Sequence, residues 1–272
     1  MAPKYPQHIS AECTVPCNLC ERTDVEVIAT RGRDEKPLRT VICIHCGLVW
    51  TDPRPSSEST RRFYTDEYRL AYKATYTPKR KHVIHETLRG LKRAEDIDDI
   101  LQPDMRLLDA GCGGGFFLYA LNRRGVQVSE IEPNNGFGSF ATTELGLPVK
   151  SGFVQDVTFP KESFGIITLH HVLEHLEDPV GILRRLCGRL KPNGFLVIEV
   201  PNVEATYHAP HNRFHISHNY NFNPATLEGI GSRAGLSVFR SRLIPRTKHI
   251  HTTFQKRANA GGVESVANIP QN

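Results

Sequence analysis

Four of the seven cysteines form two Cys-x-x-Cys pairs near the start of the sequence. The first pair is Cys17 and Cys20, and the second is Cys43 and Cys46. Two such turns can place four thiolates around one tetrahedral zinc ion. Four protein ligands leave no open coordination position, so we expect the zinc to be structural. Redox activity of the pairs is the alternative. Cysteines that are not joined in structural disulfides suit a reducing compartment such as the cytoplasm.

A second chemical signal is the glycine-rich stretch LLDAGCGGG at 107–115. Its glycines allow a tight turn from a strand into a helix and let a ligand approach the backbone closely. Asp109 places a carboxylate at the end of the strand, where open α/β sheets bind ligands. Glu132 follows about twenty residues later, where an acid can accept hydrogen bonds from both ribose hydroxyls. The alternating glycines of the loop are Gly111, Gly113 and Gly115.

The stretch HVLEH at 171–175 matches a zinc-peptidase pattern. It directly follows a predicted strand and lies downstream of the glycine loop, which argues against a peptidase. We interpret Glu174 and His175 as groups that bond to the backbone. The alternative is that His170 or His171 faces the reacting group.

A second histidine-rich segment contains His208, His211, His215 and His218. It connects a predicted strand at 195–200 to a predicted helix at 225–234. Histidine titrates near neutral pH and suits general base catalysis there. A structural role is one alternative. A second metal site is another, although the loop has no carboxylate at clear ligand spacing.

Length and charge limit the class of protein. The chain has 272 residues, a formal charge of +5 and a calculated pI of about 8.8. No run of eighteen apolar residues is present, so we expect no membrane span, and residues 1–10 lack the apolar core of a secretory signal. The basic residues of 79–93 are interpreted as a solvated helix face, which makes nucleic acid an unlikely partner. We therefore expect a cytoplasmic protein with a small-molecule substrate, and the sequence carries no signal for its oligomeric state.

Composition and apolar periodicity divide the chain into four parts. We predict a cysteine-containing module at 1–58, a helical linker or lid at 59–104, an α/β domain at 105–257 and a disordered tail at 258–272. Strands and helices alternate in the α/β domain, which predicts a parallel sheet covered by helices on both faces. The last two strands are too close for a crossover helix and must form an antiparallel hairpin. The predicted strands are 106–110, 126–132, 164–170, 195–200, 237–243 and 249–254, and the predicted helices are 115–124, 135–145, 180–190 and 225–234.

Residues 105–245 resemble a class I S-adenosylmethionine-dependent methyltransferase. The motifs are LLDAGCGGG at 107–115, EIEP at 130–133, FGIITLHHVLEHLEDP at 164–179, LKPNGFLVIEVPN at 190–202 and HNYNFNPATL at 218–227. The resemblance implies a Rossmann-like sheet of seven strands, the last one antiparallel. It also implies that Asp109 and the loop glycines hold the methionine part of S-adenosylmethionine, that Glu132 holds the ribose and that Asp156 faces the adenine amine. We place His170 with these cofactor contacts, and note that Gly165 stands where family members commonly carry aspartate.

The segment 41–68 is similar to the N-terminal module of methyltransferases that act on sugar nucleotides, envelope glycans and secondary metabolites. The chain lacks the long additional C-terminal domain of the sugar C-methyltransferases, which favours oxygen as the acceptor atom. We therefore expect O-methylation of a small molecule with a histidine base. His218 is the first candidate, His215 the second and His171 the third. An RNA methyltransferase with a zinc module and a non-catalytic cofactor-binding scaffold are the alternatives.

Overall fold

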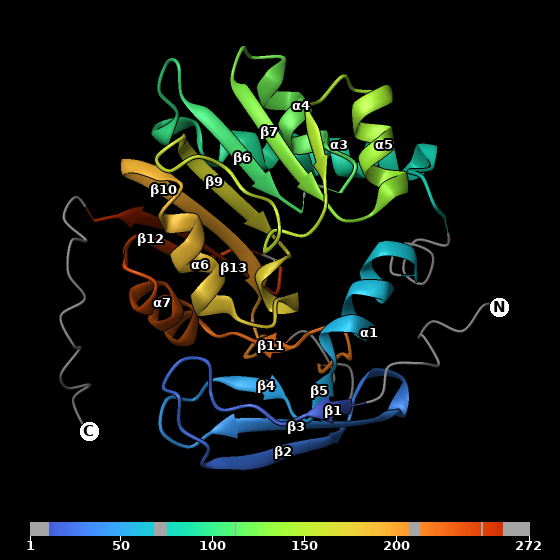
Figure 1. Ribbon diagram of the computed structural model, residues 1–272, viewed down its shortest axis with the longest axis vertical. Helices are drawn as coiled ribbons and strands as arrows, with labels where there is room; N and C mark the ends of the chain where they lie inside the picture. Colours follow the sequence, from blue (N-terminus) through green and yellow to red (C-terminus); the bar gives the residue numbers. More distant parts are fainter. Residues whose placement is uncertain (1–10, 68–74, 112, 207–212, 246, 258–272) are drawn as a thin grey trace.

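The computed structural model describes residues 11–67, 75–111, 113–206, 213–245 and 247–257 (Figure 1). A seven-stranded sheet forms the larger part of the molecule, and a four-stranded sheet forms the smaller part. Figure 1 shows the smaller sheet on the side toward which the parallel strands of the larger sheet point. None of the described helices is long and apolar enough to cross a membrane.

The larger sheet has the strand order β12-β13-β10-β9-β6-β7-β8. Strand β13 runs antiparallel to both of its neighbours, and the other neighbouring pairs are parallel. The predicted seven-stranded sheet with an antiparallel last strand is therefore confirmed. Its strands are β6 (Arg106–Ala110), β7 (Gln127–Glu132), β8 (Val149–Ser151), β9 (Phe164–His170), β10 (Leu190–Pro201), β12 (Leu236–Leu243) and β13 (His249–Lys256).

Helices cover both faces of this sheet, as expected for parallel strands that are apolar on both sides. All seven residues of β9 are buried. Figure 1 shows α3 (Arg80–Glu95) and α4 (Phe116–Asn122) on one face, with α6 (Pro179–Cys187) and α7 (Pro224–Arg233) on the other. Helix α5 (Asn135–Thr143) packs against β7 and β8. Side chains that accept a backbone N–H begin α5, α6 and α7, and these are Asn134, Asp178 and Asn223.

The smaller sheet has the order β11-β4-β3-β2. Three of its strands, β2 (Val25–Arg31), β3 (Pro37–Cys43) and β4 (Val49–Thr51), come from the N-terminal part. The fourth, β11 (Tyr220–Asn221), comes from the segment that follows β10, and pairs antiparallel with β4. Strands β1 (Ala11–Cys13) and β5 (Arg54–Pro55) pair separately. The N-terminal sheet thus includes residues far beyond the predicted module 1–58.

The predicted linker region is mainly helical in its described parts. It contains α1 (Ser57–Arg62), a π-helix at Phe63–Glu67 and α3. The remaining short helices are 3-10 turns at Arg33–Glu35, Asp98–Ile100 and Leu173–His175. The predicted tail at 258–272 and the histidines at 208 and 211 lie outside the described residues.

One local feature differs from the sequence prediction. Strand β8 was not expected, because it has only three residues and no alternating apolar pattern. Gly165 lies within β9, which has the predicted bounds, and a Cβ at this position would lie 2.8 Å from the Met105 Cγ atom.

Candidate functional site

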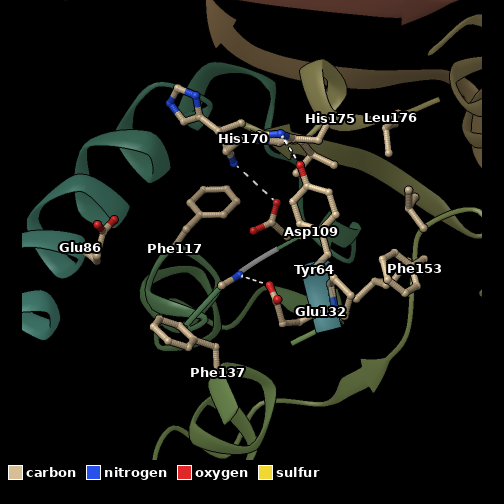
Figure 2. A pocket seen from close by; sticks show the side chains of 18 of the residues that line it. Tyr64, Glu86, Asp109, Phe117, Glu132, Phe137, Phe153, His170, His175 and Leu176 are labelled. Carbon is tan, nitrogen blue, oxygen red and sulfur yellow. Dashed lines mark hydrogen bonds and ion pairs between the residues drawn. The ribbon is translucent and has the colours of Figure 1, made fainter. Parts of the chain in front are cut away.

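A cavity of about 330 Å³ opens at the carboxyl ends of the parallel strands. Its size is within the range of small-molecule sites. One end is formed by the glycine loop and the residues after β7, and the other by α3 and the histidines after β9 (Figure 2). The cavity therefore joins the glycine loop to the HVLEH stretch, for which a role facing the reacting group was the alternative interpretation.

Glu132 fixes the shape of the glycine loop. Its carboxylate lies at the end of β7, where it accepts a hydrogen bond from the Gly113 N–H at 2.7 Å and from the Asn134 N–H at 2.9 Å. Gly111 has a φ of +86°, and a Cβ there would lie 2.5 Å from a methyl of Val172. Only glycine fits this turn. Glu132, Gly111 and Gly113 all line the cavity, and a carboxylate with two bonds still has capacity to accept ligand hydroxyls.

Asp109 and His170 lie side by side at the ends of β6 and β9 (Figure 2). The Asp109 carboxylate accepts a hydrogen bond from the Thr168 hydroxyl at 2.6 Å, and its Oδ1 is 3.5 Å from His170 Nδ1. The His170 ring packs edge-on against Phe117. Burial and the nearby charge of Arg93 lower the pKa of His170, although Asp109 acts in the opposite direction. His170 is therefore neutral near pH 7.

His171 lies between two carboxylates. Its Nε2 is 2.9 Å from Glu199 Oε1, and its Nδ1 is 3.4 Å from Glu174 Oε1. Burial works to lower the pKa of His171, but the two carboxylates outweigh it and raise the pKa. His171 also adopts a φ of +58°, a conformation that is rare outside glycine and concentrates at functional sites. Arg93 forms a two-bond ion pair with Glu199 at 3.0 and 3.1 Å and so fixes this network.

His175 closes the histidine-lined end together with Tyr64 (Figure 2). The Nδ1 of His175 is 2.6 Å from the Ser217 carbonyl oxygen, and the Tyr64 hydroxyl donates to the same carbonyl at 2.9 Å. His218 packs against the ring of His175, and His215 packs against His218. Burial lowers the pKa of His215 to about 3 and the pKa of His218 well below its usual value.

The structure brings most of the predicted site residues together. Among the described residues, those in the cavity wall are Asp109, Gly111, Gly113, Glu132, His170 and His171, whereas those outside it are Gly115, Asp156, His215 and His218. Gly115 turns away from the cavity toward Leu147 and Ala141. The Asp156 carboxylate forms a two-bond ion pair with Arg61, which itself lines the cavity.

Sequence reasoning missed the ion pair between Arg93 and Glu199. Glu199 is the one charged residue of the apolar stretch FLVIEV at 195–200, and it is buried. A charge inside an apolar strand needs a buried partner, so this residue was a usable signal. Tyr64 also lies in the cavity wall.

The four paired cysteines meet in space. The Sγ atoms of Cys17 and Cys46 are 3.4 Å apart, and so are those of Cys20 and Cys43. All four lie within 4.8 Å of one another, which suits a tetrahedral ion with sulfur bonds of about 2.3 Å. The hydrogen bond with Cys46 lowers the pKa of Cys17 to about 5, and the same bond raises the pKa of Cys46. A cation among the sulfurs would let all four ionise.

Two further groups of side chains in the described part of the chain have metal-ligating atoms within 4.8 Å of one another. One is His171, Glu199 and His249, and the other is Glu174, His175 and His218. In the first group Glu199 is already neutralised by Arg93.

Comparison with known proteins identifies the family. The methyltransferase domain family matches residues 80–241, which is more than half of the chain. The chain belongs to the S-adenosylmethionine-dependent methyltransferases. Within this methyltransferase domain, the glycine loop and Glu132 form the end of the cavity that the cofactor is expected to occupy, and the close approach that Gly111 permits fits such a ligand.

Curated relatives match a shorter part of the methyltransferase. The ubiquinone biosynthesis O-methyltransferase of Bradyrhizobium diazoefficiens is 32% identical over 103 residues, covering 36% of this chain and 40% of that protein. The enzyme of the same name from Xanthomonas campestris pv. campestris is 33% identical over 108 residues, covering 37% of this chain and 44% of that protein. The chain thus matches less than half the length of these relatives.

Solved structures share the fold. The 1,6-didemethyltoxoflavin-N1-methyltransferase of Burkholderia thailandensis, which holds 1,6-didemethyltoxoflavin and S-adenosylhomocysteine, has a TM-score of 0.60 at 16% identity, covering 79% of this chain and 98% of that chain. The cyclase SpnF has a TM-score of 0.54 at 14% identity, covering 62% of this chain and 81% of that one. Because one of these proteins is named as a cyclase, the shared fold alone does not define the reaction.

Proposed function

We propose that the protein transfers a methyl group from S-adenosylmethionine to a hydroxyl of a small molecule, such as a sugar, a glycan precursor or a natural product. The observation that carries the proposal is a cavity that joins the glycine loop to a histidine-lined wall. The names of the curated relatives support oxygen as the acceptor atom. When bound, S-adenosylmethionine supplies the methyl group from its sulfonium.

The residues at the cofactor end have separate tasks in this proposal. Glu132 accepts hydrogen bonds from the ribose hydroxyls while it holds the Gly113 N–H. Asp109 and the glycines bind the methionine part. Asp156 does not line the cavity, so we expect it to reach the adenine only if it separates from Arg61.

We assign the general base to His170. A general base must be neutral and must line the cavity. Among the histidines that the sequence analysis considered for the site, His170 has both properties. Asp109 Oδ1 lies 3.5 Å from Nδ1, too far for a hydrogen bond, but its negative charge favours a proton on Nδ1 and a lone pair on Nε2. His171 lines the cavity as well, but its two carboxylate partners outweigh burial and raise its pKa, which favours the protonated form. His215 and His218 do not line the cavity among the described residues.

The experiment uses S-adenosylmethionine with a labelled methyl group. The protein is incubated with a panel of phenols, catechols and sugars in one arm and with total RNA in the other. We expect label in a small molecule, as an ether that resists alkaline hydrolysis. Replacing His170 by alanine should lower the transfer by about 10²–10⁴-fold, whereas replacing His85, an exposed histidine of α3, should leave it unchanged. Label in RNA alone would favour an RNA methyltransferase, and no label in any arm would favour a binding scaffold.

We also propose that Cys17, Cys20, Cys43 and Cys46 hold one structural zinc ion. The support is the convergence of their four sulfurs. Because such thiolates persist in reducing compartments, we propose a cytoplasmic location. The zinc site is in contact with the methyltransferase domain, since the Asn18 side chain donates to Asp178 at 2.9 Å and accepts from the Val180 N–H at 2.9 Å.

A further inference from the structure

Glu174, His175 and His218 form a cluster at the histidine-lined end of the cavity. Each offers one ligating atom, and the three atoms lie within 4.8 Å of one another. The Glu174 side chain is 2% exposed, and its Oε2 has no hydrogen-bond partner among the described residues. A buried carboxylate oxygen without a partner is costly, so this oxygen indicates a ligand that the protein side chains do not supply.

The imidazoles of His175 and His218 each offer one ring nitrogen to the cluster. A carbonyl oxygen only accepts, so the contact of 2.6 Å to the Ser217 carbonyl places the proton of His175 on Nδ1. The lone pair is then on Nε2, which lies 3.9 Å from Glu174 Oε1. This is the second-sphere arrangement that orients metal-bound histidines. The neighbouring His218 ring lies 4.9 Å from that of His175, and its ligating nitrogen lies within 4.8 Å of those of Glu174 and His175.

The carboxylate is oriented in the same way. His171 Nδ1 lies 3.4 Å from Glu174 Oε1. His171 is itself held by Glu199, and Glu199 by Arg93. A chain of buried polar groups therefore leads from α3 to Glu174 and leaves its second oxygen available.

We propose that Glu174, His175 and His218 bind one divalent first-row transition-metal ion, such as Zn²⁺, separate from the four-cysteine site. Two imidazoles and a carboxylate suit this class of ion rather than Mg²⁺ or Ca²⁺. Bonds of about 2.0–2.2 Å place neighbouring ligand atoms about 3.4 Å apart, so the three side chains need only small movements. Three protein ligands leave an open coordination position, as in catalytic sites.

The role of the ion rests on the proposed O-methylation, whereas the metal site itself does not depend on it. His175 lines the cavity, so the ion lies next to the acceptor end. A cation there binds the acceptor hydroxyl oxygen and lowers its pKa. The hydroxyl proton passes to His170. The hydroxyl oxygen keeps the electron pair of the broken O–H bond and becomes the nucleophile. The ion also selects acceptors that have a hydroxyl or a pair of adjacent hydroxyls.

The test is Co²⁺ binding to the purified protein with its cysteine site filled by zinc, in the absence of acceptor and cofactor. We expect one Co²⁺ per chain, with visible d–d bands and without the near-ultraviolet bands of cobalt–thiolate bonds. Glu174→Gln and His218→Ala should each weaken Co²⁺ binding by at least about 100-fold, since loss of a ligand costs more than loss of an outer contact. The matched control His85→Ala should bind Co²⁺ normally.

Thermal unfolding of each variant checks that the fold survives, and His218→Asn, which keeps a polar side chain of similar shape, serves if the alanine variant does not fold. Bands of thiolate type only, or unchanged affinity in the folded variants, would overturn the metal site. Because no methyl transfer is measured, the site can be confirmed even if the acceptor proves not to be a hydroxyl. Conversely, O-methylation by a protein that does not bind Co²⁺ would support the proposed function and refute the proposed metal site.

Discussion

Replacing Glu132 by glutamine tests the cofactor end of the cavity with the least change in shape. The carboxylate accepts from two backbone donors, the Gly113 N–H at 2.7 Å and the Asn134 N–H at 2.9 Å. A glutamine amide has one acceptor oxygen and one NH₂ group. One of the two backbone N–H groups would therefore face another donor, and the ribose would lose its charged acceptor.

The expected magnitudes follow from these contacts. A lost hydrogen bond to a charged group is worth about 1.5–3 kcal/mol, so affinity for the cofactor should fall by about 10- to 150-fold. The unpaired backbone N–H next to a side chain that is nearly fully buried should lower the free energy of unfolding by about 1–3 kcal/mol. The loss of affinity arises at the ligand, and the loss of stability arises at the glycine loop.

Calorimetric titration with S-adenosylhomocysteine measures the first effect, and urea denaturation without ligand measures the second. The matched control is Glu144→Gln, an exposed glutamate just after α5, which should change neither quantity by more than about 0.5 kcal/mol. Unchanged affinity in Glu132→Gln would refute the assignment of Glu132 to the ribose. Unchanged stability with lowered affinity would show that its bonds to the loop are dispensable.

Four other outcomes are expected. Cys43→Ser should release about one zinc ion per chain and destabilise the N-terminal module, since structural zinc energy is folding energy; full zinc content by elemental analysis would contradict this. With an acceptor in hand, His170→Ala should lower turnover by about 10²–10⁴-fold, and because burial and Arg93 lower the pKa of His170, the wild-type rate should be level near pH 7 and fall only on acidification below about pH 6.5. Gly111→Ala should lose at least about 1 kcal/mol of stability, because alanine disfavours a φ of +86°, and a wild-type melting temperature would argue against the turn. Arg93→Ala removes the two-bond ion pair of buried Glu199 and leaves it only its histidine contacts, so the variant should cost up to about 3–5 kcal/mol in urea denaturation, whereas Arg93→Lys should recover part of this loss.

Much of the larger sheet could be predicted from the sequence, because its central strands are buried on both faces. Strands β6 and β9 have the predicted bounds, since mainly apolar stretches lead up to Ala110 and to His170. The cofactor end could also be predicted, because a glycine loop and an acid at the next strand end are local patterns. Strand β8 could not be predicted, since its three residues take their conformation from pairing with β7.

The acceptor end could be predicted only as a set of histidines. Which of them line the cavity depends on the packing of α3 and on the segment before β11, neither of which has a local sequence signature. His218 was favoured from its place in the chain, yet it packs against His175 behind the wall. The pKa values of His170 and His171 also shift in opposite directions, because burial and Arg93 lower the first, whereas Glu174 and Glu199 outweigh burial and raise the second.

The pairing of β11 with β4 has a consequence for how the protein is made. The Thr51 hydroxyl donates to the His218 carbonyl across 167 positions of sequence, and Tyr220 pairs with Trp50. A ribosome that has just released the N-terminal strands therefore leaves the edge of β4 open until the segment around residue 220 has emerged. Such an edge can pair with another chain, and contacts of long sequence separation form slowly. Nascent chains stalled before this point should consequently be more prone to aggregate, and more dependent on chaperones, than chains released after β11.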